Sequence, residues 1–254
     1  MSLADLAAAV GRRDAKSGTD DYVDIITFIE APWGLDLKLF PVQRVILKAH
    51  YGMALDDNDL GIPLDVAVDS SHPDWDPAWE PLLDEEGYYL YTIVVTDFRR
   101  ENVRYMTEAG YLRYLHDEGR SKIREVVPGR QRREMVLSVG RRSGKTLITS
   151  CIVAYENYKL LLKGNPQKYY GSSQSNVIQL ISVATDRDQA GLLYREASGH
   201  FSKCDFFKPY TANATQSFAT FQTPYDIDQY GSYADNQKAR YSINVTFRSC
   251  VAKG

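Results

Sequence analysis

Apolar runs and polar breaks alternate in a regular order along the second half of the chain. The run MVLSV, 135–139, predicts a buried strand, and the turn GRRSGKT leads from it into LITSCIVAYENYKLLL, a helix that ends at Gly164. VIQLISVAT, 177–185, predicts a second buried strand, DRDQAGLLYREASGHF a second helix with Asp186 as its N-cap, and YSINVTFRS a last strand. This order favours an α/β fold, a parallel sheet covered by helices.

The first half of the chain is less regular. FPVQRVILKAHYG, 40–52, has the spacing of an amphipathic helix that starts at Pro41. Its expected apolar side consists of Val42, Val45, Ile46 and Ala49. The stretch 55–97 holds no Lys or Arg, and its run YYLYTIVV predicts a hairpin within a surface insertion.

These patterns suggest a division of the chain. We expect an N-terminal helical or lid segment over 1–34 and one domain over 35–254, with the insertion at 55–97. The polar, aromatic run NATQSFATFQTPYDIDQYGSYADNQ in the tail is expected to be an ordered loop.

Composition narrows the classes of protein. With 254 residues, 44% of them hydrophobic, the chain can bury one sizeable core. The net charge of −3 excludes a protein coated with positive charge, so a nucleic-acid contact would need a local patch.

Cys151, Cys204 and Cys250 lack any C-x-x-C spacing, which favours free thiols over a disulfide framework or a zinc site. No run has membrane-spanning length and no signal peptide is recognisable, so we expect a soluble, unexported protein without a membrane partner.

The turn between 139 and 146 carries the clearest chemistry. Main-chain N–H groups ahead of a helix can hold a polyphosphate, a lysine reaches its β and γ phosphates, and a following hydroxyl binds Mg²⁺. Gly144, Lys145 and Thr146 supply these parts, although the first glycine of the usual G-x-x-x-x-G-K-[ST] pattern is displaced to Gly140. A glycine-rich turn that merely starts a helix is the alternative, and a lysine in the first turn argues against it because it opposes the helix dipole.

The stretch VGRRSGKT, together with FPVQRVIL at 40–47 and ISVATDRDQAG at 181–191, resembles the large terminase subunit, the DNA-packaging motor ATPase of tailed double-stranded DNA phages. The resemblance covers roughly 35–254. It implies an ASCE-type P-loop NTPase fold that binds ATP and Mg²⁺. It further implies double-stranded DNA, the phage portal and procapsid, and the small terminase subunit as partners, a homo-oligomeric ring, and a location in the cytoplasm of the infected host cell.

The same resemblance assigns roles to individual residues. Lys145 and Arg141 are expected to be catalytic, with Arg141 the candidate arginine finger and Arg142 the competing one. Gln43 is expected to contact the adenine base, with an exposed helix residue as the alternative. Thr146 is the expected Mg²⁺ ligand. The full expected nucleotide-binding set is Gln43, Gly140, Arg141, Arg142, Ser143, Gly144, Lys145 and Thr146.

One departure from the family pattern concerns hydrolysis. The family carries a strand ending in Asp-Glu, which orders Mg²⁺ and the attacking water, and no such pair follows the loop in this sequence. We therefore expect an incomplete ATPase domain, no nuclease domain, and slow ATP hydrolysis despite retained binding. Two alternatives stay open: another P-loop enzyme such as a helicase relative or small-molecule kinase, and a non-catalytic nucleotide-binding assembly module. The basic segment 119–133 is expected to be a solvated linker rather than a DNA contact.

Overall fold

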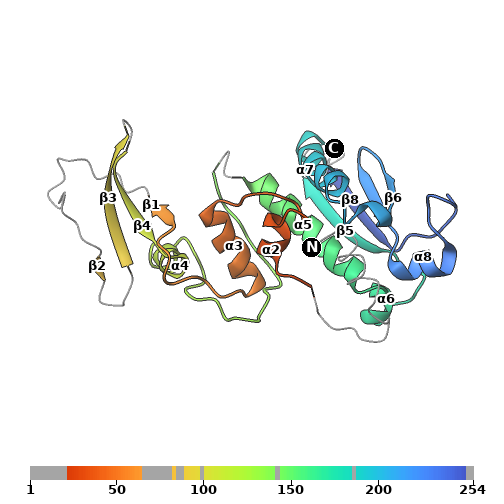
Figure 1. Ribbon diagram of the computed structural model, residues 1–254, viewed down its shortest axis with the longest axis horizontal. Helices are drawn as coiled ribbons and strands as arrows, with labels where there is room; N and C mark the ends of the chain where they lie inside the picture. Colours follow the sequence, from red (N-terminus) through yellow and green to blue (C-terminus); the bar gives the residue numbers. More distant parts are fainter. Residues whose placement is uncertain are drawn as a thin grey trace, which may run out of the picture. The chain divides into compact units, whose positions relative to one another are not determined.

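The computed structural model describes residues 22–64, 82–83, 89–97, 100–140, 144–184 and 187–249. The chain divides into two compact units, unit 1 with residues 1–38 and 139–254, and unit 2 with residues 39–138 (Figure 1). The stretch 55–97, expected as an insertion, lies within unit 2. Residues 1–21 lie outside the described part of the chain, as do Asp186 and Cys250.

Unit 1 is built on a mixed four-stranded sheet in the order β5-β8-β7-β6. Strands β5 and β8 run parallel, as predicted, whereas β7 is antiparallel to both β8 and β6, so the expectation of an all-parallel sheet is wrong. The elements of the unit are α2 (Ile25–Glu30), α5 (Lys145–Leu162), α6 (Pro166–Tyr169), β5 (Ile178–Ala184), α7 (Arg187–Lys203), the 3-10 helix η1 (Lys208–Tyr210), β6 (Thr211–Ala214), β7 (Phe218–Phe221), α8 (Pro224–Tyr230) and β8 (Ile243–Ser249).

The polar tail is folded more fully than its composition indicates. It is ordered, as expected, but it forms β6, β7 and α8 rather than a loop. Helix α8 begins with a capping box, in which the Thr223 hydroxyl accepts from the Asp226 N–H and the Asp226 carboxylate accepts from the Thr223 N–H. The aromatic residues Phe218 and Phe221 belong to strand β7, and Phe221 is completely buried.

Helix α7 lies along β5 and β8, and α5 packs against α7 (Figure 1). The core of the unit is aromatic: Phe28 on α2 stacks on Tyr158 of α5, with ring centroids 4.6 Å apart, and it also meets Phe207 edge-on. Phe207 in turn contacts Phe221 of β7. These rings tie α2 and α5 to the sheet, and because each large ring removes much apolar area from water, they dominate the burial energy of the unit.

Unit 2 contains α3 (Pro41–Tyr51), β1 (Ile62–Leu64), β2 (Leu82–Leu83), β3 (Tyr89–Asp97), β4 (Arg100–Met106) and α4 (Glu108–Asp117). Its sheet has the order β1-β4-β3-β2 and is antiparallel throughout. The predicted hairpin is confirmed by the pairing of β3 with β4. The predicted helix at 40–52 is confirmed by α3, which begins at Pro41 and ends at Gly52 in a left-handed conformation.

An apolar cluster and an ion-pair group hold α3 and α4 together. Val45, Ile62 and Leu112 form the cluster. The carboxylate of Glu108, only 12% exposed, accepts from the Lys48 ammonium at 2.5 Å and from the Asp56 N–H at 2.9 Å. These contacts make unit 2 a folded body with its own core.

Candidate phosphate-binding loop

Helix α5 starts at the position that the phosphate-loop pattern requires. Its N-cap is Gly144, with φ 77° and ψ 18°, a left-handed conformation that side-chain-bearing residues rarely adopt. The helix then runs for 18 residues from Lys145. Its first-turn N–H groups have no partner within the helix, and together with the helix dipole they create a positive, donor-rich end.

The Lys145 side chain folds back over the loop that precedes its helix. Its ammonium donates to the carbonyl oxygens of Val139, at 2.7 Å, and Gly140, at 3.0 Å. Lys145 is nevertheless exposed, as is Thr146 beside it. The ammonium thus lies against two carbonyl groups of the preceding segment while it remains accessible to a ligand arriving from solvent.

The other expected phosphate-loop residues divide into two groups. Gly140 is exposed on the loop, and Arg141, Arg142 and Ser143 lie outside the described residues, so the choice of arginine finger stays a prediction. The Thr146 hydroxyl is exposed and has no hydrogen-bond partner within the described part of the chain. An exposed hydroxyl next to the Lys145 ammonium could hold Mg²⁺ together with phosphate oxygens and water, so the assignment of Thr146 stays a prediction.

The predicted buried strand at 135–139 is wrong. These residues belong to no strand of the described structure, and the Val136 side chain is 94% exposed. A strand is held by hydrogen bonds to neighbouring strands, and the described sheet of unit 1 ends at β5 without a partner from this run. The boundary between the two units also falls within the run, between Ser138 and Val139.

Strand β5 differs from expectation in a related way. It was predicted as fully buried, but its residues alternate between partly buried and exposed, and Ile181 and Val183 are 55% and 57% exposed. Leu180 and its alternate neighbours share the face of Val245, which packs toward α7. The opposite face of β5 is therefore open to solvent.

Gln43 is a buried residue of unit 2 rather than an exposed one. The residue is 5% exposed, and its amide oxygen accepts from the Phe40 N–H at 3.0 Å at the start of α3. The exposed-helix alternative is wrong, and the amide has a structural role in the absence of a nucleotide. Its proposed contact with adenine stays a prediction.

A buried polar contact fixes the orientation of α5. The Ser150 hydroxyl donates to the Leu147 carbonyl oxygen at 2.9 Å and lies 2.9 Å from His200 Nε2 on α7. With its proton committed to Leu147, the hydroxyl accepts from the imidazole. Burial lowers the pKa of His200, Lys203 lowers it further and Glu196 opposes them, so the ring is neutral at pH 7. Sequence patterns give no signal for this pair because the two residues lie on different helices.

A left-handed glycine at a helix start, an exposed lysine closed over the preceding loop, and an adjacent hydroxyl are the features of a P-loop site. The comparison with protein families agrees with that class. Residues 116–236, which include the loop and all of α5, match the family model described as "Uncharacterized protein MJ0330, N-terminal P-loop domain". The chain therefore contains a region similar to a P-loop domain, within a mixed α/β structure.

The comparisons with curated proteins and with solved structures gave no match. Within the described residues, no helix has both the length and the apolar character needed to cross a membrane.

Proposed function

We propose that the chain binds ATP with Mg²⁺ at the loop Val139–Thr146. The observation that carries this proposal is the Lys145 ammonium, held at 2.7 Å and 3.0 Å from two loop carbonyl oxygens at the N-terminus of α5. A cation in a first helical turn opposes the dipole, and a bound triphosphate reverses that penalty. The match to a P-loop domain supports the same assignment.

Each group then has a defined task. The first-turn N–H groups of α5 and the Lys145 ammonium bind phosphate oxygens, and the Thr146 hydroxyl binds Mg²⁺, which neutralises phosphate charge. Arg141 is proposed to approach the γ phosphate. From the resemblance alone, Gln43 is proposed to contact the adenine base.

Calorimetric titration of the chain with ATP and Mg²⁺ tests the binding site. Lys145→Ala should weaken ATP binding about 30- to 150-fold, since a charge-assisted hydrogen bond contributes about 2–3 kcal/mol. Lys168→Ala removes another exposed lysine of unit 1, one with no part in the loop, and should leave affinity unchanged. Equal ATP affinity for wild type and Lys145→Ala would refute the assignment.

At the finer level, we propose that the chain is the ATP-binding part of a DNA-packaging motor resembling the terminase large subunit. Support comes from VGRRSGKT, FPVQRVIL and ISVATDRDQAG in this order along the chain. A motor couples its nucleotide to its track, so duplex DNA should raise ATP affinity, and ATP should raise DNA affinity by the same factor.

Steady-state ATPase assays with and without duplex DNA separate this proposal from its competitors. We expect slow turnover, because no Asp-Glu pair follows the loop to activate water. Phosphate transfer to a small-molecule acceptor would instead identify a kinase. Nucleotide binding that DNA does not affect at all would favour a non-catalytic assembly module and contradict the motor.

A further inference from the structure

Residues 126–134, VVPGRQRRE, form a loop in unit 2 that we call the arginine loop. It opens with a tight turn in which the Arg130 N–H donates to the Val127 carbonyl oxygen at 3.2 Å. Pro128 and Gly129 occupy the central positions, and Gly129 has φ 79°. Proline followed by a left-handed glycine is typical of a type II turn, so the local sequence itself specifies this bend.

The loop is fixed to the end of α3. The Gly129 N–H donates to the Gly52 carbonyl oxygen and the Arg132 N–H donates to the His50 carbonyl oxygen, both at 2.8 Å. The Arg130 backbone passes so close to Gly52 that a Cβ on this glycine would lie 2.5 Å from the Arg130 oxygen. This part of the basic segment is therefore exposed, as expected of a solvated linker, but its backbone is anchored to the end of α3.

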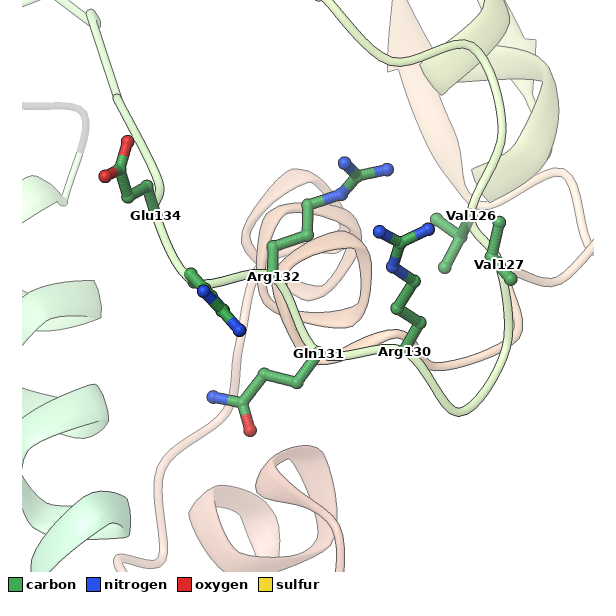
Figure 2. Close-up of a pocket in the computed structure, with 7 residues that line it drawn as sticks. Val126, Val127, Arg130, Gln131, Arg132 and Glu134 are labelled. Carbon is green, nitrogen blue, oxygen red and sulfur yellow. The ribbon is translucent and has the colours of Figure 1, made fainter.

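A cavity of about 720 Å³ lies along the loop, lined by Val126, Val127, Arg130, Gln131, Arg132, Arg133 and Glu134. Figure 2 shows the Arg130 and Arg132 side chains extending to the same side as Val126 and Val127, whereas Gln131 and Glu134 point elsewhere. Val126 also packs against the apolar cluster of unit 2. One wall of the cavity thus belongs to the core of the unit, and the backbone that carries the two arginines is fixed to α3 by the hydrogen bonds described above.

The charges of the cavity are unbalanced. Three arginines line it against one carboxylate, Glu134, which points away from the Arg130 and Arg132 pair (Figure 2). Within the described residues, neither of these two guanidinium groups belongs to an ion pair. Two like charges on one side of a loop repel each other, and an anion between them removes that cost. Guanidinium groups fit phosphate oxygens in bidentate geometry.

We propose that Arg130 and Arg132 of the arginine loop bind phosphate groups of a nucleic-acid backbone. The cavity is open, with Arg130 and Arg133 exposed, and Arg120 and Lys122 continue the exposed positive charge earlier in the segment. An extended series of cations suits a polyanion that carries many phosphates better than one small anion. The choice of double-stranded DNA among polyanions rests on the proposed function. The inference that the loop binds phosphate groups does not depend on that function.

Fluorescence anisotropy of the full chain with a labelled duplex of about 20 base pairs, over a range of salt, tests the proposal. The variant Arg130→Ala/Arg132→Ala should bind at least ~10-fold more weakly, and its salt slope should fall by about 2, since each lost phosphate contact removes about 0.9. The control Lys168→Ala/Lys203→Ala removes the same charge from two exposed positions of unit 1, outside the cavity, and should lose much less. Arg130→Lys/Arg132→Lys should keep the salt slope but lose part of the affinity, because lysine lacks the bidentate fork.

Three results would overturn the assignment: unchanged DNA binding by the double alanine variant, an equal loss in the matched control, or a loss of ATP affinity alone. Thermal melting of each variant checks that it is folded. ATP titrations in parallel keep the two sites apart, because Lys145→Ala should weaken nucleotide binding and leave the DNA salt slope intact. The proposal for the arginine loop can therefore be refuted without refuting the proposal for the phosphate loop, and the reverse also holds.

Discussion

Gly52→Ala should detach the arginine loop without removing any charge. Gly52 has φ 66°, and an alanine in this left-handed region costs about 1–2 kcal/mol. The new Cβ would also lie 2.5–2.7 Å from three backbone atoms of Arg130, so the loop must move away. Its two hydrogen bonds to α3 contribute about 1 kcal/mol each, which brings the expected loss of stability to about 3–4 kcal/mol.

Gly119→Ala is the matched control for this substitution. Gly119 has φ 68° and belongs to the same unit, but no atom lies within 4 Å of its added Cβ. It should therefore show only the conformational cost of about 1–2 kcal/mol. Urea unfolding followed by circular dichroism measures both, and hydrogen exchange at residues 129 and 132 should rise only in Gly52→Ala. Equal destabilisation by the two substitutions would show that the close approach at Gly52 contributes nothing.

The remaining predictions concern buried groups of unit 1. Burial lowers the pKa of His200 in the folded state, so the unfolded chain binds a proton at a higher pH than the folded chain does. Stability that is present above pH 6.5 should therefore be lost as the pH falls below 6.5. Wild type should lose more stability than His200→Gln between about pH 7 and pH 5, as thermal melts will show. Burial raises the pKa of the Cys151 thiol to about 12, and Cys204 is also buried. Iodoacetamide at pH 8 should therefore label both thiols only after the protein unfolds, as peptide mass spectrometry will show. Labelling of Cys151 in the native protein would contradict this prediction.

The sequence predicts local structure well where the signal is local. Pro41 starts α3, Gly164 follows the end of α5, and the strand at 243–249 pairs in parallel with β5. Each of these elements depends on a run of periodic apolar residues with a recognisable start or stop, and neighbouring residues carry that information. The glycine at the start of α5 belongs to the same category, because its left-handed backbone is a property of one residue.

The errors arise where contacts with distant parts of the chain determine the structure. The apolar pattern of MVLSV predicts a buried strand, but a buried strand needs a neighbouring strand, and Val136 is exposed. The polar tail reads as a loop because periodicity is weak in strands as short as β6 and β7. The arginine loop reads as a linker because its fixation depends on backbone bonds to Gly52 and His50, nearly 80 residues earlier in the chain.

The Lys145 ammonium already satisfies two carbonyl oxygens before any ligand arrives. A nucleotide must therefore displace these neutral acceptors, and the measured benefit of the lysine is the difference between two sets of hydrogen bonds rather than the full strength of one. When the ammonium moves onto phosphate, the carbonyl groups of Val139 and Gly140 become available to water. Ligand occupancy should thus be detectable from the backbone of these two residues, through carbonyl ¹³C chemical shifts, without any probe on the nucleotide.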